Sequence, residues 1–142
     1  MDMVWPSPIN VEPLQGLTNL HDLTITGLGF TAITAIEHVE AIGEILSLDK
    51  LTLGSLLILD LSFLRKLQNL RELSLHQLPV QSIEPLRNLK SLQNLSMVEI
   101  NVVDISPLLE LPKLGTFRYI RVPARTDVLT ELARRGVKVG PR

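Results

Sequence analysis

The chain has 142 residues, a formal net charge of −1 and no cysteine, and aromatic residues make up only 4% of it. The absence of cysteine excludes disulfides, thiol nucleophiles and thiolate metal sites, and the near-neutral charge offers no general attraction to nucleic acid. Because 45% of the residues are hydrophobic, a domain of this length has to build its core from leucine, isoleucine and valine.

The start of the chain and its apolar runs indicate the cellular location of the protein. The first ten residues, MDMVWPSPIN, have neither the basic start nor the apolar stretch of a signal peptide. The longest apolar run, from Leu51 to Leu64, is too short to span a bilayer and contains Asp60. Together with the absence of cysteine, these features favour a soluble, cytoplasmic protein.

One leucine-rich motif recurs along most of the chain. The pattern Leu-x-x-Leu-x-x-Leu-x-Leu, with some other apolar residues in place of leucine, begins at Leu17, Ile45, Leu67, Leu89 and Leu111. The last four copies follow one another with a constant 22-residue period, and the first interval is longer, at 28. A step of three residues fits neither an α-helix nor a strand, but it suits 3₁₀ turns, in which residues i and i+3 eclipse on one face. The Leu-x-Leu step that ends each copy predicts a short strand with both leucines pointing inward.

Successive copies are expected to stack as the coils of a solenoid. A single coil cannot bury its own leucines, so neighbouring coils have to stabilise one another. The predicted fold class is therefore an α/β solenoid, with a parallel sheet on the concave side and short 3₁₀ or helical turns on the convex side. Pro13, Pro85 and Pro107 suit the start of such turns, because a missing N–H costs nothing there.

The N-terminal end departs from the regular coils. Stepping back one repeat period from Leu23 and Ile25 reaches Met1 and Met3, so residues 1–14 are interpreted as a partial repeat that begins inside a strand. Trp5 is expected to cover this open end. We therefore expect one domain over residues 1–142, with repeats over about 15–120, that either belongs to a longer protein or pairs with a partner through its open end.

The longer first interval contains the segment TAITAIEHVEAIGEIL. Its apolar residues from Ile33 to Ile42 predict a longer helix on the outer side, with Thr31 or Thr34 as its N-cap. We interpret this segment as a length variant of the repeat rather than as a functional insertion.

Residues 121–142 predict a C-terminal cap made of a helix and a strand. The segment from Asp127 to Arg135 reads DVLTELARR, with Thr126 at the N-cap position and Gly136 at C′. The following VKV predicts a last edge strand.

These repeats resemble the 22-residue leucine-rich repeats of bacterial internalins. The resemblance lies in the segments Ile83–Leu86 and Ile105–Leu108, which both read Ile-x-Pro-Leu, and in the repeated leucine steps. It spans nearly the whole chain. The family usually has an asparagine three residues after the strand, whose side chain bonds backbone groups in a ladder. Here that position holds Leu28, Leu56, Leu78 and Ile100, so either apolar packing replaces the ladder or the bend has another shape.

Residues that alternate with the inward leucines should face outward from the concave side of the sheet. We expect these residues to bind a partner: Asp22, Thr24, Thr26, Lys50, Thr52, Glu72, Ser74, His76, Asn94, Ser96, Val98, Thr116, Arg118 and Ile120. Small hydroxyl residues along the middle of the sheet would let a partner approach closely. The alternative is that threonine and serine are simply tolerated in strands.

The sequence contains no pattern typical of a catalytic site. His21, His38 and His76 lie at unrelated positions of the repeat, without metal-ligand spacing. The segment GLGF, Gly27–Phe30, lacks the third glycine of a dinucleotide site. We expect no catalytic, cofactor-binding or metal-binding residues, and no cofactor.

The C-terminal part is basic. From Lys113 onward there are eight basic residues against Asp127 and Glu131, namely Lys113, Arg118, Arg121, Arg125, Arg134, Arg135, Lys138 and Arg142. We interpret this end as a solvated cap rather than a nucleic-acid site. The expected partner is a protein, or upstream domains of the same chain, and not a membrane.

The resemblance implies a non-catalytic interaction or ligand-sensing module. Short repeats that end in a small basic helix and strand resemble the C-terminal sensors of bacterial NACHT-type NTPases that act in immunity. There the repeats recognise a trigger or restrain the NTPase. The alternatives are an internalin-like surface adhesin and a regulatory or scaffold subunit of an enzyme.

Overall fold

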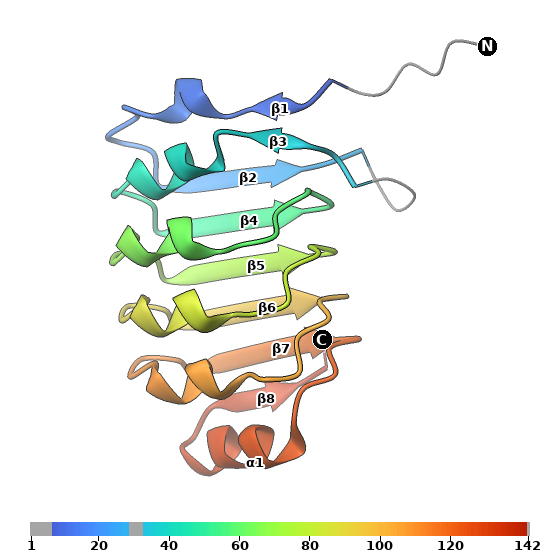
Figure 1. Ribbon diagram of the computed structural model, residues 1–142. Coiled ribbons are helices and arrows are strands. Elements are labelled where there is room, and N and C mark those ends of the chain that lie inside the picture. The colour runs from blue at the N-terminus through green and yellow to red at the C-terminus, as the bar shows by residue number, and fades with distance from the viewer. Residues whose placement is uncertain (1–6, 29–32, 142) are drawn as a thin grey trace, which may run out of the picture.

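The computed structural model describes residues 7–28 and 33–141, and these form a solenoid of stacked coils (Figure 1). The strands are β1 (Ile9–Asn10), β2 (Asp22–Thr26), β3 (Ile36–Glu37), β4 (Lys50–Gly54), β5 (Glu72–His76), β6 (Asn94–Val98), β7 (Thr116–Ile120) and β8 (Lys138–Gly140). The helices are the 3₁₀ turns η1 (Glu12–Leu14), η2 (Val39–Glu44), η3 (Ser62–Lys66), η4 (Glu84–Asn88) and η5 (Ser106–Glu110), and the α-helix α1 (Thr126–Arg134). None of these helices has the length and apolar content that a membrane crossing requires.

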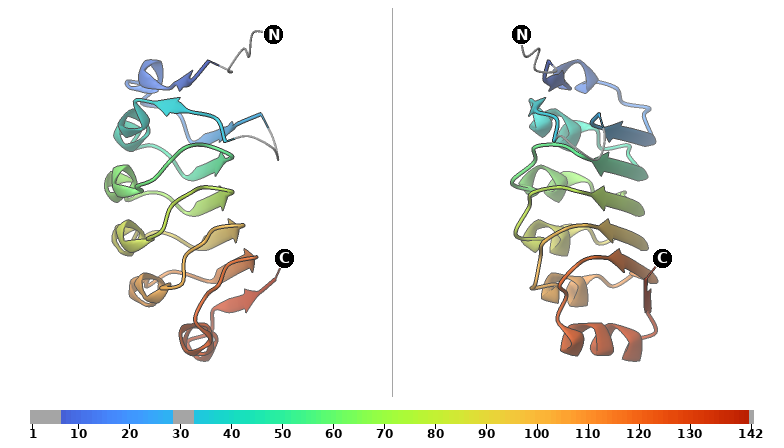
Figure 2. Two further views of the ribbon diagram at one scale, coloured as in Figure 1. Left: turned by 45° about the vertical axis from the view of Figure 1, so that its right-hand side comes forward. Right: turned by 90° about the vertical axis from the view of Figure 1, so that its right-hand side faces the viewer.

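The strands form a parallel sheet on one side of the solenoid, and the 3₁₀ turns lie along the other (Figure 2). The large sheet has six strands in the order β2-β4-β5-β6-β7-β8, and β1 pairs with β3 in a separate two-stranded sheet. Each strand of the large sheet pairs with the strand of the next coil at the same position of the repeat, as Leu73 does with Leu95. The predicted fold class is confirmed.

The three-residue leucine step forms the turns that the sequence predicts. The amide of Leu64 donates to the carbonyl of Leu61 at 3.0 Å, and that of Leu67 donates to the carbonyl of Leu64 at 3.0 Å. This i→i+3 pattern places the side chains of one coil on one face. Leu61, Leu64, Leu67 and Leu70 are all fully buried. The apolar residues of successive coils merge into one continuous core.

The core is less complete at the N-terminal end. Leu17 is 45% exposed, whereas Leu67 and Leu89, at the same position of later coils, are fully buried. Leu23 and Ile25 of β2 are only half-buried, because β2 is the first strand of the large sheet. The predicted strand at Met1 and Met3, and Trp5, lie outside the described residues.

The longer helix predicted over the first interval is wrong. Residues 33–46 contain a bridge from Thr34 to Leu56, then β3, then the short turn η2, which follows His38 in a left-handed conformation with φ of 60°. Thr34 caps no helix; its buried hydroxyl accepts a hydrogen bond from the Leu28 amide at 3.1 Å. Thr31 lies outside the described residues. The apolar spacing of three in this segment belongs to a coil of the solenoid, which a pattern-based helix assignment does not distinguish.

The C-terminal helix and strand are present as predicted, except for the N-cap. Arg125 occupies the N-cap position, and Thr126 is the first helical residue. Gly136 follows the helix with φ of 91°, its amide donates to the carbonyl of Ala133, and the next amide donates to the carbonyl of Leu132. These two bonds are those of a Schellman motif, which glycine favours because it carries no Cβ.

A ladder of polar side chains runs along the turn that follows the strands. Ser55, Gln77, Glu99 and Arg121 each take a left-handed conformation directly after a strand. The Ser55 hydroxyl donates to Gln77 Oε1 at 2.8 Å, Gln77 Nε2 donates to Glu99 Oε2 at 2.7 Å, and Arg121 Nη1 pairs with Glu99 Oε1. We call these four residues the turn ladder.

The turn ladder stands beside the position at which asparagine is expected from the resemblance to internalin repeats. Leu56, Leu78 and Ile100, at that position, are buried in the core, while Leu28 is 79% exposed. Apolar packing therefore replaces the asparagine side chain in these three coils. The residue before each takes up the hydrogen bonding, because the amides of Gln77 and Glu99 donate to strand carbonyls of the following coil at 2.8 Å.

Because Glu99 is hydrogen-bonded within the turn ladder, we expect its contribution to the stability of the folded protein to depend on pH. The hydrogen bond from Gln77, and then the Arg121 guanidinium, lower the pKa of Glu99 below its ordinary value of 4.5. A carboxyl whose pKa is lower in the folded protein adds stability that is fully present above the unfolded pKa and lost as the pH falls through the folded one. Urea unfolding should therefore find Glu99→Gln less stable than wild type at pH 7, with the difference shrinking toward zero below pH 4.

A suitable control is Glu37→Gln, since Glu37 is an exposed glutamate of β3 whose side chain has no partner among the described residues. Its effect should be small and should depend little on pH. A Glu99→Gln difference that is constant from pH 7 to pH 3 would contradict the role of the ionised carboxyl.

Candidate functional site

The outward residues of the large sheet form three rows, which together we call the strand face. The first row is Asp22, Lys50, Glu72, Asn94, Thr116 and Lys138, and the middle row is Thr24, Thr52, Ser74, Ser96, Arg118 and Gly140. The third row is Thr26, Gly54, His76, Val98 and Ile120. Every residue that the sequence predicts for partner binding lies in one of these rows. Hydrogen-bonded registry between parallel strands puts them there, because each coil repeats the same alternation.

The strand face is accessible to solvent. Thr24 and Arg118 are exposed, and Ser74 and Ser96 are half-buried between their larger neighbours. The alternating Leu73 and Leu75 point to the other side and are buried in the core. The face therefore carries the polar half of each strand, and the core carries the apolar half.

Most polar side chains in the middle of the strand face have unused hydrogen-bonding capacity. Among the described residues, none forms a side-chain hydrogen bond or ion pair with Ser74, Asn94, Ser96, Thr116 or Arg118. Lys50 Nζ lies 3.8 Å from Glu72 Oε2. Both of these side chains are about half exposed, and such surface pairs contribute at most about 1 kcal/mol. The five side chains without such bonds are thus available to a partner without loss of existing contacts.

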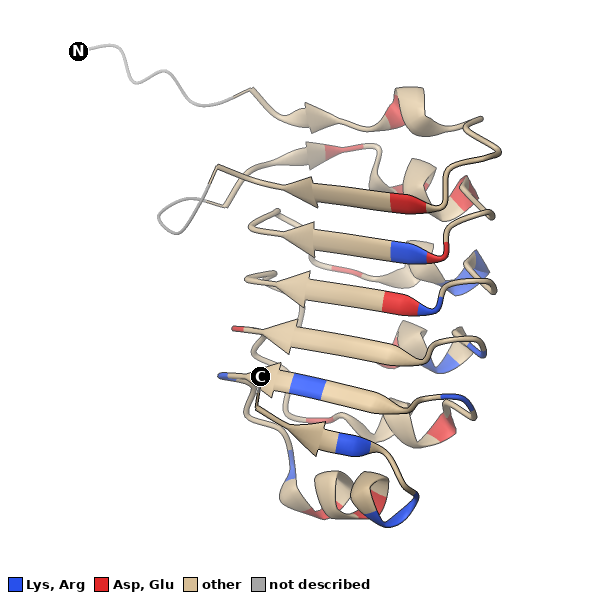
Figure 3. Ribbon diagram, turned by 180° about the vertical axis from the view of Figure 1, so that it is seen from behind, with Lys and Arg blue, Asp and Glu red and all other residues tan. Residues whose placement is uncertain are grey.

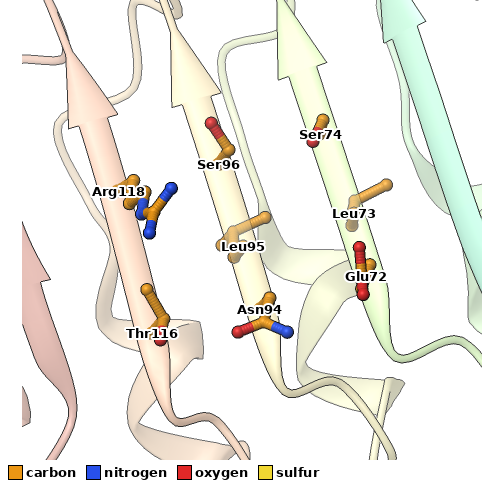
Figure 4. A pocket seen from close by; sticks show the side chains of 8 residues that line it. All are labelled: Glu72, Leu73, Ser74, Asn94, Leu95, Ser96, Thr116 and Arg118. Carbon is orange, nitrogen blue, oxygen red and sulfur yellow. The ribbon is translucent and has the colours of Figure 1, made fainter. Parts of the chain in front are cut away.

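The strand face is hollowed over β5, β6 and β7. A shallow depression of about 320 Å³ is lined by Glu72, Leu73, Ser74, Asn94, Leu95, Ser96, Thr116 and Arg118. Figure 4 shows the small side chains of Ser74, Ser96 and Thr116 in the depression, while the longer Glu72 and Arg118 stand on its outer strands. Its depth follows from the short hydroxyl side chains of the middle row. We call this depression the strand-face hollow.

Charge changes along the strand face. Figure 3 shows alternating acidic and basic segments on β2, β4 and β5, an uncharged β6, and basic segments on β7 and β8. The basic side chains are Lys50 on β4, Arg118 on β7 and Lys138 on β8. The C-terminal third of the face is therefore positive.

Most other basic residues near the C-terminal end are neutralised locally. Arg125 pairs with Asp127 at 2.9 Å, and Arg134 and Arg135 both pair with Glu131, at 2.9 and 2.8 Å. Hydrogen bonds from Arg134 and Arg135 lower the pKa of Glu131 to about 2. The basic excess that the sequence shows is thus partly used within the cap, whereas Arg118 and Lys138 face outward from the sheet.

The histidines are placed separately. His21 Nδ1 lies 3.0 Å from Asp49 Oδ2, His38 Nδ1 lies 3.3 Å from Glu40 Oε1, and His76 lies in the third row of the strand face. In the described ranges no three histidine, aspartate or glutamate side chains are gathered as a metal site requires.

Two features of the strand face were not predicted from the sequence. Lys138 extends the first row and Gly140 the middle row, because β8 pairs with β7. Both positions could have been inferred from the sequence, because Lys138 follows Thr116, and Gly140 follows Arg118, by one repeat period. The turn ladder has the same spacing, but its residues differ in type from coil to coil, so their shared conformation has no compositional signal.

Comparisons with known proteins show which solved structures have a similar fold. A comparison with protein-family models finds no match, and a comparison with curated protein sequences finds none either. Among solved structures, internalin C2 of Listeria monocytogenes matches with a TM-score of 0.77 and 30% identity, over 92% of this chain and 55% of that one. The internalin inlF of the same organism matches with a TM-score of 0.77 and 22% identity, over 93% of this chain and 37% of that one.

A leucine-rich repeat protein of Leptospira interrogans also matches, with a TM-score of 0.59 and 17% identity, over 89% of this chain and 38% of that one. The chain thus spans about half, or less, of the length of the solved proteins that it matches. Sequence repeat, coil geometry and these likenesses agree on a leucine-rich repeat solenoid.

Proposed function

We propose that this leucine-rich repeat solenoid is a non-catalytic protein-binding module that uses its strand face. The observation that carries the proposal is the strand-face hollow, where the side chains of Ser74, Asn94, Ser96 and Thr116 form no hydrogen bonds among the described residues. Polar groups on a rigid sheet can bond a partner at low entropic cost, because the backbone that positions them is already ordered.

Within this class, we propose a sensor or autoinhibitory tail of a bacterial NACHT-type NTPase in the cytoplasm. The support is the resemblance of short repeats that end in a small basic helix and strand, which here are α1 and β8. In this setting the strand face would contact either a trigger or the NTPase region of the same polypeptide. An internalin-like adhesin and a regulatory or scaffold subunit are the alternatives, and the likeness to the two internalins is one of fold that favours none of these settings over the others.

Site-specific photocrosslinking tests the proposed face. A photoreactive amino acid placed at Ser96, on the strand face, should form a protein adduct in cells that express the whole native polypeptide. The same amino acid at Arg65, exposed on η3 on the other side of the solenoid, should form little or none. An adduct from Arg65 but not from Ser96 would place the interface elsewhere.

The adduct also separates the settings. Mass spectrometry that maps the Ser96 adduct to an NTPase region of the same polypeptide supports the autoinhibitory tail. An adduct with a protein outside the producing cell supports the adhesin, and an adduct with a separate enzyme supports the regulatory subunit.

A further inference from the structure

Arg118 is the side chain of the strand-face hollow with the greatest capacity to bind a partner. Its guanidinium carries five N–H donors and cannot lose its charge in a protein. It is exposed, and no described residue forms a hydrogen bond or ion pair with it. Figure 4 shows the guanidinium reaching from β7 toward β6, on the side of Ser96 and Thr116.

The surroundings of Arg118 favour an anion. Ser96 is its register partner on β6, and Thr116 lies two residues earlier on β7, so two hydroxyl donors flank the guanidinium. Lys138 is the register partner of Thr116 on β8 and adds a second exposed positive charge. The acidic residues near this end, Glu99, Asp127 and Glu131, are held by Arg121, Arg125, Arg134 and Arg135 rather than by Arg118.

Resting on the proposed function, we propose that Arg118 binds a carboxylate of the partner: an aspartate or glutamate side chain in an extended segment that crosses the strands. The guanidinium supplies a bidentate pair of hydrogen bonds, which matches the planar carboxylate. The hydroxyls of Ser96 and Thr116 donate to the same group, and Lys138 adds attraction over a longer range.

Glu72 restricts which residue types the bound segment can carry at the other side of the hollow. It lies on β5 at the opposite edge of the same hollow, two strand spacings or roughly 10 Å from β7. An extended segment covers that distance in about three residues. An acidic residue placed three positions from the one bound by Arg118 would approach Glu72 and find no free cation there, because the neighbouring Lys50 already pairs with Glu72 at 3.8 Å. The preferred segment therefore has an acidic residue at one position and an uncharged or basic residue three positions away.

A library of random 12-residue peptides displayed on phage, selected against the immobilised full chain, tests this inference. Selected sequences should be enriched in aspartate and glutamate relative to the input. Synthetic peptides from the selection should bind Arg118→Ala about tenfold or more weakly than wild type, as loss of a bidentate ion pair implies. Their affinity should also fall as the salt concentration rises.

Two matched variants complete the design. Arg65→Ala removes an exposed arginine from η3, outside the strand face, and should leave the affinity unchanged. Replacing the critical glutamate of the peptide by glutamine should weaken binding to wild type and have little further effect on binding to Arg118→Ala. Circular dichroism should show the same fold for both protein variants.

The outcomes separate this inference from the proposed function. Neutral or basic consensus peptides whose binding is lost in Ser96→Trp would overturn the carboxylate assignment and leave the strand face as the binding surface. Acidic peptides that bind Arg118→Ala and Ser96→Trp as tightly as wild type would overturn both, as would a selection that yields no binder. A phosphoserine peptide that binds much more tightly than its glutamate counterpart would assign the site to phosphate instead.

Discussion

Leu92→Ala is expected to destabilise the solenoid by about 3 kcal/mol, within the range observed for buried leucines in other proteins. Leu92 is fully buried in a central coil, so the substitution loses apolar burial and leaves a cavity between neighbouring coils. Because each coil contacts only its neighbours, the loss weakens the interface on both sides at once. Urea unfolding followed by circular dichroism should report the change as a lower midpoint.

Leu59→Ala is the matched control, because Leu59 is 69% exposed on the segment between β4 and η3. The same atoms are removed there with little loss of burial, so its stability should stay within about 0.5 kcal/mol of wild type. Equal effects of the two variants would contradict the assignment of the three-residue leucine row to the core.

Gly43→Ala is expected to destabilise the protein by about 2–3 kcal/mol through overpacking. A Cβ added at Gly43 would lie 2.2 Å from the carbonyl oxygen of Phe63 in the next coil. Backbone cannot rotate away as a side chain can, so η2 and η3 would have to separate. The usual advantage of alanine over glycine in a helix, about 1 kcal/mol, acts in the opposite direction and is smaller than the clash.

Gly140→Ala in β8 serves as its control, since nothing lies within 4 Å of the Cβ that it would add. Thermal and urea unfolding of both variants should show a loss for Gly43→Ala alone. A Gly43→Ala protein as stable as wild type would mean that η2 and η3 are not packed so closely.

Much of the strand face could be predicted from the sequence. Once the repeat period is known, the outward row of Thr52, Ser74 and Ser96 follows from alternation in a strand, because the inward positions are held by leucine. The match between register and period then makes neighbours of residues that lie one period apart, such as Lys50 and Glu72. Parallel stacking of identical coils leaves no other registry that buries all the leucines.

The segment between β2 and β4 shows where such prediction fails. Its apolar spacing of three is shared by a helical pattern and by a coil of the solenoid, and the choice depends on a partner strand. Here β1 pairs with β3, and Thr34 bridges to Leu56, so extended backbone replaces the first half of the predicted helix, and the short turn η2 takes the place of the second half. A local sequence pattern cannot reveal which backbone hydrogen bonds a segment makes to other coils. In this segment those bonds stabilise extended backbone more than its weak helix propensity stabilises a helix.

The solenoid, its period, its core and the outward row of the sheet follow from the amino-acid pattern alone, because one repeated leucine pattern has one way to be buried. Which of these polar side chains remain available to a partner depends on how the folded coils bring side chains together. Arg118 and Arg121 look alike in the sequence, yet Arg121 is paired with Glu99 of the preceding coil and Arg118 stands free in the hollow among the described residues. The physical reason is that an ion pair depends on side-chain direction and on conformation at the turn, where Arg121 is left-handed with φ of 53°, and neither is encoded by residue type alone.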